Sequence, residues 1–350
     1  MYPKKRKAAV YYGKDDLRIE EIDVPKIKPN EVLIKIKAVG VCGSDVHFYK
    51  EGRIGPYVPK PGHILGHEPA GVIVAVGENV KNRKVGDRVA IEPGIPCGEC
   101  ELCRKGKYNL CKEMLFMTHT NPYREGAFVE YVPQPAQFTY FLNDNVSFEE
   151  GAMAEPLSVA MQAIKNGNLK PGESVAILGS GPIGICMLLA SRAAGASEVY
   201  NTDLDDTRVN CAKEFGATDA FNAKKEDIVE RIMKATNNRG VDLVIETAGA
   251  AETYENATSL ATRGGKIVFV GMSAETHFPI NVFNIIDKEL IVSSVFRYNN
   301  VYGAAVSLIN NGLIPIKKII THRFKLEDAS KALNLAYMRD DNVIKAVVTF

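Results

Sequence analysis

Short runs in which apolar and polar side chains alternate fill residues 5–92 of the chain. The stretch VLIKIKAVGVCG at residues 32–43 alternates as a half-buried strand does, and AGVIVAVG and DRVAIEP follow the same pattern. Gly and Pro interrupt these runs at short intervals. The pattern predicts a compact, barrel-like β domain in the first part of the chain.

The periodicity changes near residue 153. GAMAEPLSVAMQAIKNG has helical spacing, and strands then alternate with helices from ESVAILG to GGKIVFVGM. This alternation predicts a doubly wound parallel sheet, so the fold class is α/β. After about residue 295, two more helices and strands end in IKAVVTF, and we expect this tail to return to the first domain. The expected domains are therefore residues 1–153 with 296–350, and residues 154–295.

Composition and charge narrow the possible functions. The chain has 350 residues, 46% hydrophobic and 24% charged, with a formal net charge of +1. This balance argues against a broad surface for nucleic acid. The sequence has neither a long apolar run nor the apolar core of a signal peptide, so we expect no membrane partner and a cytoplasmic location. In a reducing compartment, its seven cysteines indicate metal binding rather than disulfides.

A glycine motif after a strand indicates a nucleotide site. VAILGSGPIG places Gly179, Gly181 and Gly184 in a G-x-G-x-x-G that opens a helix, and Asp203 closes the next strand. Such a turn lets the cofactor diphosphate approach the helix N-terminus. Asp203 would accept hydrogen bonds from ribose hydroxyls and repel a 2′-phosphate, which favours NAD over NADP. Arg208 leaves this open, because it could accept that phosphate.

Four cysteines lie close together in PCGECELCRKGKYNLC. Cys97, Cys100, Cys103 and Cys111 have the spacing C-x2-C-x2-C-x7-C. Four thiolates fill a tetrahedral Zn²⁺ shell and leave no position for a substrate, so we expect a structural zinc. The spacing does not match a bacterial ferredoxin run, which has three residues before the fourth cysteine and Pro after it.

A second candidate metal site comes from GVCGSDVH and LGHEPAG. Cys42, His67 and Glu68 supply a thiolate, an imidazole and a carboxylate beside Gly-rich turns. Each alone reads as a structural residue, but three such ligands with one open position define a catalytic zinc site. Glu155 adds a second carboxylate at the expected domain junction, where clefts form.

The chain resembles the zinc-containing medium-chain dehydrogenases, especially the polyol dehydrogenases of the sorbitol dehydrogenase type. The motifs that carry this resemblance are CGSDVHFYKEGRIG, LGHEPAG, EPLSVA, LGSGPIG and SVFRYNN. The resemblance runs nearly end to end. It implies a GroES-like catalytic domain, a Rossmann domain, NAD and two zinc ions per chain, one catalytic and one structural. It also implies that Cys42, His67 and Glu68 surround the catalytic zinc, with Glu155 either a ligand or one water away.

The same resemblance implies further contacts. Arg297 and Tyr298 would touch substrate or cofactor, and Phe48 stands where some sorbitol dehydrogenases have Tyr, which blurs the choice of polyol. The full set of expected cofactor contacts is Gly179, Gly181, Pro182, Ile183, Gly184, Asp203, Arg208, Val270, Gly271, Met272, Val295, Phe296 and Arg297. The expected substrate contacts are Phe48, Glu155, Arg297 and Tyr298.

The implied reaction is oxidation of a secondary alcohol of a polyol, such as sorbitol, L-iditol or xylitol, to a ketose. Ser44 is the expected first proton acceptor, and by the family pattern the cofactor ribose and His47 continue the relay. Two alternatives remain open: a threonine or simple alcohol dehydrogenase, and a catalytically inactive relative that binds zinc and nucleotide. Relatives are commonly tetramers or dimers, so the resemblance also implies a homo-oligomer.

Overall fold

The structure, a computed structural model, describes residues 2–118, 120–273, 275 and 277–350. Two compact units divide the chain: unit 1 is Met1–Glu155 with Asn299–Phe350, and unit 2 is Pro156–Tyr298. The predicted domain limits, after residues 153 and 295, lie slightly upstream of these boundaries. The last part of the chain therefore belongs to the same unit as the first part.

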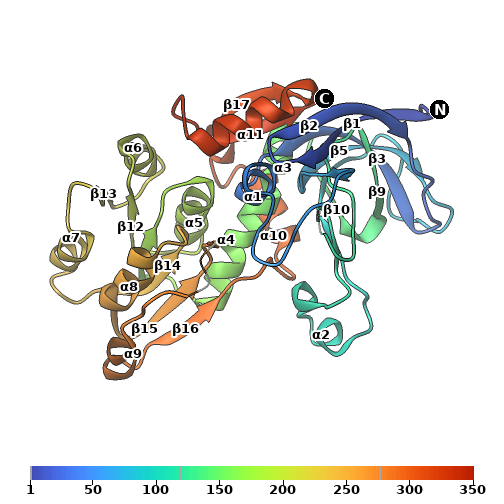
Figure 1. The fold of residues 1–350 in the computed structure, drawn as a ribbon. Helices are drawn as coiled ribbons and strands as arrows, with labels where there is room; N and C mark the ends of the chain where they lie inside the picture. Colours follow the sequence, from blue (N-terminus) through green and yellow to red (C-terminus); the bar gives the residue numbers. More distant parts are fainter. Residues whose placement is uncertain (1, 119, 274, 276) are drawn as a thin grey trace. The chain divides into compact units, whose positions relative to one another are not determined.

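Unit 1 is built around a larger mixed sheet and a smaller antiparallel sheet (Figure 1). The larger sheet has the strand order β10-β6-β5-β3-β18-β17, with β9 also paired to β3, and a smaller sheet has the order β2-β1-β4. Its elements are β1 (Lys5–Gly13), β2 (Asp16–Asp23), β3 (Glu31–Gly40), α1 (Gly43–Glu51), β4 (His63–Ile64), β5 (Glu68–Val76), β6 (Arg88–Ile91), β7 (Gly94–Ile95), α2 (Glu101–Arg104), η1 (Tyr108–Leu110), β8 (Leu115–Phe116), β9 (Tyr131–Pro135), η2 (Ala136–Phe138), β10 (Thr139–Phe141), α3 (Phe148–Ala152), α10 (Tyr302–Asn310), η3 (Ile316–Ile319), β17 (Ile320–Lys325), η4 (Leu326–Asp328), α11 (Ala329–Met338) and β18 (Lys345–Thr349).

Three strand ends of unit 1 meet at one place. Strands β3 and β5 are antiparallel with Gly40 opposite Glu68, so the end of β3 lies beside the start of β5. Strand β18 pairs with the other side of β3, with Val347 opposite Gly40. Residues just after β3, just before β5 and at the start of β18 are therefore brought together, although they are far apart in sequence.

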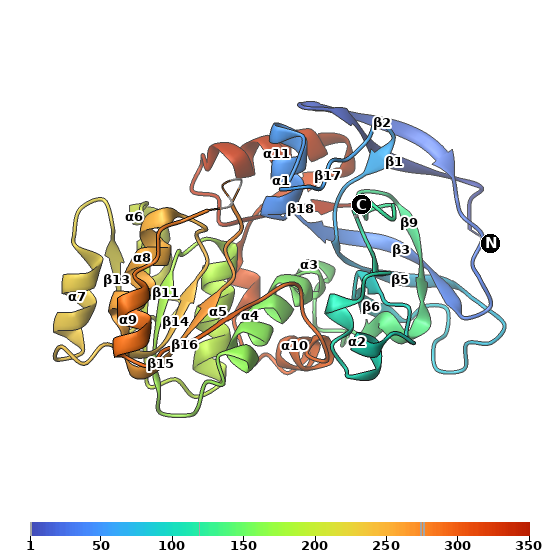
Figure 2. The same cartoon turned by 60° about the horizontal axis from the view of Figure 1, so that its bottom comes forward.

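Unit 2 is the predicted doubly wound parallel sheet, and this fold class is confirmed. Figure 2 shows β11 and β14 between α5 on one side and α8 with α9 on the other. Helix α4 (Ala154–Asn166) carries the chain into this unit. Its other elements are β11 (Ser174–Leu178), α5 (Pro182–Ala193), β12 (Glu198–Asp203), α6 (Asp206–Glu214), β13 (Asp219–Asn222), α7 (Ile228–Ala235), β14 (Val241–Glu246), α8 (Ala251–Leu260), β15 (Ala261–Phe269), α9 (Val282–Asp287) and β16 (Ile291–Ser294).

The strand order of unit 2 is β13-β12-β11-β14-β15-β16. The chain runs outward from β11 to β13, then crosses back and continues from β14 on the other side of β11. Strands β11 and β14 therefore flank the point where the order reverses, which in open α/β sheets is where ligands bind, at the carboxyl ends of the strands. The register places Leu178 opposite Glu246 at these ends.

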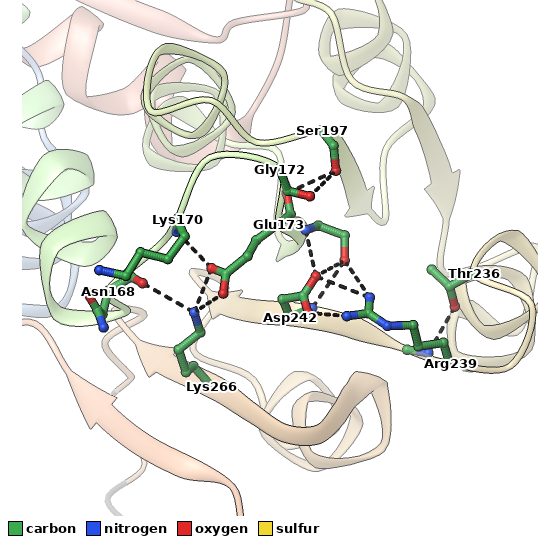
Figure 3. A network of polar contacts seen from close by, with 11 residues as sticks. Asn168, Lys170, Gly172, Glu173, Ser197, Thr236, Arg239, Asp242 and Lys266 are labelled. Atoms are coloured by element: carbon green, nitrogen blue, oxygen red, sulfur yellow. Dashed lines mark hydrogen bonds and ion pairs between the residues drawn. The ribbon is translucent and has the colours of Figure 1, made fainter.

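A polar network closes the opposite, amino-terminal edge of the same sheet (Figure 3). The backbone N–H and the hydroxyl of Ser174 donate to Asp242 Oδ2 at 2.9 and 2.8 Å, and Arg239 pairs with the same carboxylate. Lys266 Nζ donates to both oxygens of Glu173, at 2.9 and 2.6 Å. These contacts tie the starts of β11 and β14 to each other and the start of β11 to the middle of β15, away from the glycine motif.

No helix among the residues that the structure describes is both long and apolar enough to cross a membrane.

Candidate metal and cofactor sites

The meeting point of the three strand ends in unit 1 holds the second candidate metal site. Cys42 is the N-cap of α1, directly after β3, and His67 and Glu68 stand at the start of β5. Ligand atoms of these three residues all lie within 4.8 Å of one another. His67 and Glu68 are buried, with 6% and 1% of their surface exposed, and Cys42 is half-buried. The antiparallel register of β3 and β5 is what brings them together.

Asp45 connects the two loops that carry these ligands. Its carboxylate is fully buried, with Oδ2 accepting from the Cys42 N–H at 3.4 Å and Oδ1 accepting from the Gly66 N–H at 2.9 Å. His67 Nδ1 lies 3.4 Å from the same Oδ1. Burial opposes charge on the imidazole, but the Asp45 carboxylate and the Cys42 sulfur outweigh it and raise the pKa of His67 well above its usual value. The negative charges around the imidazole suit a cation at this place.

Glu68 has a partner from the far end of the chain. Lys345 Nζ, at the start of β18, donates to Glu68 Oε1 at 2.8 Å and lies 2.6 Å from Oε2. Both side chains are nearly inaccessible, with 2% and 1% exposed. Gly40 makes room for this pair, because a Cβ at that position would lie 1.8 Å from Glu68 Oε2 and 3.0 Å from Lys345 Cε.

The donor set fits zinc. A thiolate, an imidazole and a carboxylate are ligand types that Zn²⁺ takes, and three of them leave the open position of a catalytic site. Among the buried side-chain atoms of the described residues, His67 Nδ1 and Glu68 Oε2 have no aligned hydrogen bond. Each atom has a charged neighbour instead, with Asp45 Oδ1 3.4 Å from His67 Nδ1 and Lys345 Nζ 2.6 Å from Glu68 Oε2, and each can still take a metal ion or a water as a further partner. The residues present can therefore hold the metal that their chemistry implies.

The other residues expected at this site differ in burial and in their neighbours. Glu155, on α4, is 5% exposed and does not belong to the three-residue ligand group. Burial, and next the charge of Glu155, raise the pKa of Tyr302. Ser44 and His47 lie three residues apart on α1, so they share a face of the helix. His47 Nδ1 is 3.0 Å from Glu51 Oε1, and Phe48 is buried in the apolar core of unit 1.

The four-cysteine cluster forms a second group within 4.8 Å. Cys97 Sγ lies 3.6 Å from Cys111 Sγ and 3.9 Å from Cys103 Sγ. Tetrahedral zinc with Zn–S bonds of about 2.3 Å separates its sulfurs by about 3.8 Å, so these distances fit four zinc thiolates. They are much longer than a disulfide bond. Backbone N–H groups of Glu99 and Cys100 lower the pKa of Cys97 to about 7, whereas burial raises the pKa of Cys103 and of Cys111.

The glycine motif of unit 2 has the expected turn. Gly179 follows β11 with φ of +110°, a conformation that side chains disfavour, and Gly181 is the N-cap of α5. Pro182 and Ile183 form the first turn of this helix. A Cβ on Gly184 would lie 1.9 Å from the Gly179 carbonyl oxygen, so the helix packs tightly against the turn.

Asp203 ends β12 with both carboxylate oxygens already in use. Oδ2 accepts from the Ser180 N–H at 2.8 Å, and Oδ1 accepts from the Leu204 and Asp205 N–H groups at 2.8 and 3.2 Å. Arg208 Nη1 lies 4.0 Å from Oδ2. Ribose hydroxyls would have to donate to the remaining lone pairs of the Asp203 carboxylate, and Arg208 stands beside this carboxylate. The choice between NAD and NADP therefore stays a prediction.

The remaining expected cofactor residues lie on two segments of unit 2. Val270, Gly271 and Met272 follow β15, and Met272 is 60% exposed. Val295 donates its N–H to Phe269 O at 2.9 Å just after β16. Arg297 has a left-handed backbone, φ of +58°, and its guanidinium carbon lies 4.8 Å from the centre of the Phe296 ring. Tyr298 is 3% exposed.

Three residues near the candidate group of Cys42, His67 and Glu68 had no role in the sequence prediction. Asp45 is part of GVCGSDVH, but this motif does not show which residues the Asp45 side chain contacts. Lys345 lies in the last strand, and only the strand order shows that it meets Glu68. Phe116 lies on β8, and its ring centre is 5.6 Å from that of His67, a neighbour that sequence spacing does not reveal.

Comparison with known proteins agrees with this geometry. Residues 28–144 match the alcohol dehydrogenase GroES-like domain, and residues 182–311 match the zinc-binding dehydrogenase domain. A sorbitol dehydrogenase of Bacillus subtilis is 41% identical over 99% of this chain and 98% of its own. An L-idonate 5-dehydrogenase of Vitis vinifera is 39% identical over 97% of this chain and 93% of its own. The solved structure of a Sinorhizobium meliloti zinc-binding dehydrogenase bound to NADP has a TM-score of 0.91 and 30% identity, covering 99% of this chain and all of that one.

The chain belongs to the zinc-binding, medium-chain alcohol dehydrogenase family. It is a zinc-type oxidoreductase of the alcohol and polyol class. The resemblance drawn from its motifs, and the fold class drawn from its periodicity, are confirmed by these matches.

Proposed function

We propose that this chain oxidises a secondary alcohol of a polyol to a ketose with NAD as the hydride acceptor. The observation that carries the proposal is the group of Cys42, His67 and Glu68, whose ligand atoms lie within 4.8 Å of one another. The similarity to a sorbitol dehydrogenase and an L-idonate 5-dehydrogenase supports a polyhydroxylated substrate, since sorbitol and L-idonate carry several secondary hydroxyls.

In this proposal unit 1 is the catalytic unit. Zinc held by Cys42, His67 and Glu68 would supply Lewis-acid chemistry, which lowers the pKa of an alcohol, and NAD would take the hydride. Ser44 Oγ would accept the hydroxyl proton while its own proton passes along the relay to His47, which lies on the same face of α1, is 44% exposed and would release a proton to water. Glu51 holds the His47 ring through Nδ1.

The family resemblance assigns substrate orientation to a small set of side chains. Glu155 is a buried carboxylate that can pair with the metal or with a water beside it. Arg297 can donate two parallel hydrogen bonds to neighbouring hydroxyls or hold the cofactor, while Phe48 and Tyr298 complete the expected substrate contacts. A site that pairs hydroxyls in this way rejects deoxy analogues strongly, because its own polar groups would be left unpaired.

Unit 2 is the proposed dinucleotide-binding unit. The turn from Gly179 to Gly184 would cradle the diphosphate at the start of α5, and Asp203 would select NAD. The four-cysteine group in unit 1 would hold the structural zinc, giving two zinc ions per chain. Asp203→Ala should lower kcat/KM for NAD relative to NADP, and an unchanged ratio would refute this assignment.

The chain is also proposed to form a homo-oligomer. Strand β16 ends the sheet of unit 2 and, in the described part of the chain, pairs only with β15. Ile291 and Val292 on this edge strand are 62% and 41% exposed. An exposed apolar edge strand is suited to pairing with a second copy. Ile291→Lys should lower the molar mass in solution measured by light scattering, and an unchanged mass would contradict this interface.

A substrate and cofactor panel tests the main proposal. Sorbitol, xylitol, L-threonine and ethanol would each be assayed with NAD and with NADP; preference for threonine or ethanol would replace the polyol assignment. Cys42→Ser should abolish turnover and remove one zinc per chain while the protein stays folded. Cys211→Ser is the matched control, because this half-buried thiol lies outside both metal groups. Turnover retained in Cys42→Ser would refute the catalytic assignment.

A further inference from the structure

Glu246 is a buried acid at the carboxyl end of β14 that the proposed mechanism does not use. It is fully buried, and its Oε1 accepts from the Ala248 and Gly249 N–H groups, both at 2.7 Å, and from Thr253 Oγ1 at 2.8 Å. Burial raises the pKa of Glu246, while these donors oppose that rise. One carboxylate oxygen therefore fixes the whole turn from β14 into α8.

The turn fixed by Glu246 lies against the glycine-rich turn. Thr247 Oγ1 donates to the carbonyl oxygens of Leu178 and Gly179 at 2.9 and 3.3 Å. The Thr247 N–H also donates to Leu178 O, at 2.9 Å. A Cβ on Gly179 would lie 2.6 Å from Thr247 Oγ1, so these two turns leave no space for a side chain between them. A displacement of Thr247 would displace the first glycine of the motif.

The opposite side of this turn packs against the segment after β15. A Cβ on Gly249 would lie 2.7 Å from Met272 O, and one on Gly271 would lie 2.3 Å from the Gly249 nitrogen and 2.6 Å from Glu246 Oε2. The backbone carbonyl of Glu246 accepts from the Val270 and Gly271 N–H groups at 2.9 and 3.1 Å. The two loops are therefore in backbone contact, and Glu246 binds to both.

These contacts surround the place where the strand order of unit 2 reverses, between β11 and β14. We propose that Glu246 is a positioning residue for the dinucleotide: it holds the Thr247–Gly249 turn, which in turn fixes the glycine-rich turn and the Val270–Met272 segment. The inference rests on the proposed NAD site in unit 2. Glu246 itself need not touch the cofactor; it sets the backbone groups that do.

The first test measures NADH affinity of the full-length, zinc-loaded protein. Because the chain has no tryptophan, nicotinamide emission can be followed without interference from indole. Glu246→Ala should raise the Kd for NADH at least tenfold. Glu246→Gln should stay within about threefold of wild type, because an amide oxygen can still accept from both N–H groups. Thr253→Val removes one of the three donors to Glu246 Oε1 and also the hydroxyl contacts with Ala250 at the start of α8, and it should also remain near the wild-type Kd.

A second pair of variants covers the case in which Glu246→Ala fails to fold. Gly249→Ala keeps the acid but pushes the turn away from Met272, and it should raise the Kd for NADH by a similar factor. Gly264→Ala is the matched control, since its φ of +70° is close to the +68° of Gly249 and nothing lies within 4 Å of its added Cβ. Both alanines should lower the melting temperature through backbone strain, but only Gly249→Ala should change the Kd.

The outcomes separate this inference from the proposed function. If the wild-type protein binds NADH and the folded Glu246→Ala or Gly249→Ala variant binds it equally well, the inference is overturned alone. If the wild-type protein binds neither NADH nor NAD, the proposed function fails and the inference fails with it. A loss of affinity in Gly264→Ala equal to that in Gly249→Ala would show that strain anywhere in unit 2 weakens binding, which also overturns the positioning role.

Discussion

Replacing Lys345 with methionine would remove a buried cationic partner of Glu68 and keep a side chain of similar length. The two groups are 2% and 1% exposed, and the ammonium lies 2.8 and 2.6 Å from the two carboxylate oxygens. Breaking such a buried pair leaves an uncompensated charge and costs about 3–5 kcal/mol. For a unit of this size, each kcal/mol lowers the melting temperature by about 2–4 °C. The metal-free variant should therefore melt roughly 6–20 °C below the metal-free wild type.

Zinc should rescue much of this loss if Glu68 lies at the metal. A divalent cation beside the carboxylate replaces the missing positive charge, so we expect the zinc-loaded variant to lose less than half as much. By linkage, the variant should then bind zinc more tightly than the wild type does. Lys345→Arg, which keeps the charge, is the control. The assay is thermal unfolding of metal-free and zinc-loaded protein, with the zinc content of each sample measured.

Equal losses with and without zinc would show that Glu68 does not meet the metal, and this would refute the reasoning. A variant as stable as the wild type in both states would show that the ion pair adds nothing to stability.

Three further predictions follow from contacts of single residues. Gly40→Ala should cost one zinc per chain and most of kcat, because its Cβ would lie 1.8 Å from Glu68 Oε2. The control Gly43→Ala, whose Cβ would have nothing within 4 Å, should keep the zinc and kcat. Metal analysis and steady-state kinetics compare the two variants. Cys100→Ser should lose the other zinc and lower the melting temperature while kcat of the folded enzyme is kept; a fall in kcat at unchanged melting temperature would contradict the structural role. Asp242→Asn should cost about 1.5–3 kcal/mol near neutral pH. Burial alone would raise the pKa of Asp242, but Arg239 and Ser174 lower it overall, so this stabilisation is present above the unfolded pKa of about 3.9 and disappears as the pH falls through the folded value. The gap between the melting temperatures of the two proteins should therefore start to narrow below about pH 4 and close once the pH is below the folded pKa of Asp242, and a constant gap would count against the pairing.

Much of the fold could be predicted because its signals are local. The alternation at residues 32–43 became β3, and the strand-helix alternation after residue 153 became the parallel sheet of unit 2. The grouping of Cys42 with His67 and Glu68 was also accessible, because both motifs stand at strand ends beside glycines. What spacing could not supply was the register that sets Gly40 opposite Glu68.

Contacts between distant segments could not be predicted from these motifs. Lys345 and Glu68 are 277 positions apart, and a lysine in IKAVVTF looks like any polar residue of a strand. The surroundings of Asp203 were also hidden, since the motif identifies an acidic residue but not the three backbone N–H groups that occupy it. Both cases depend on which backbone groups face a side chain, and that is decided by tertiary packing.

The position of Lys345 gives the return of the chain to unit 1 a chemical role. If the tail only completed the sheet, an apolar residue at this buried position would stabilise β18 at least as well, since burying a lysine costs free energy unless it is paired. The tail instead delivers an ammonium group to the carboxylate of a candidate metal ligand, while Gly40 leaves space for both. The charge therefore lies beside the candidate metal group, and we predict that it limits how strongly Glu68 can bind a cation. The four-cysteine group has no comparable cationic partner among the described contacts of its thiols, which is consistent with a closed site that only needs to retain its metal.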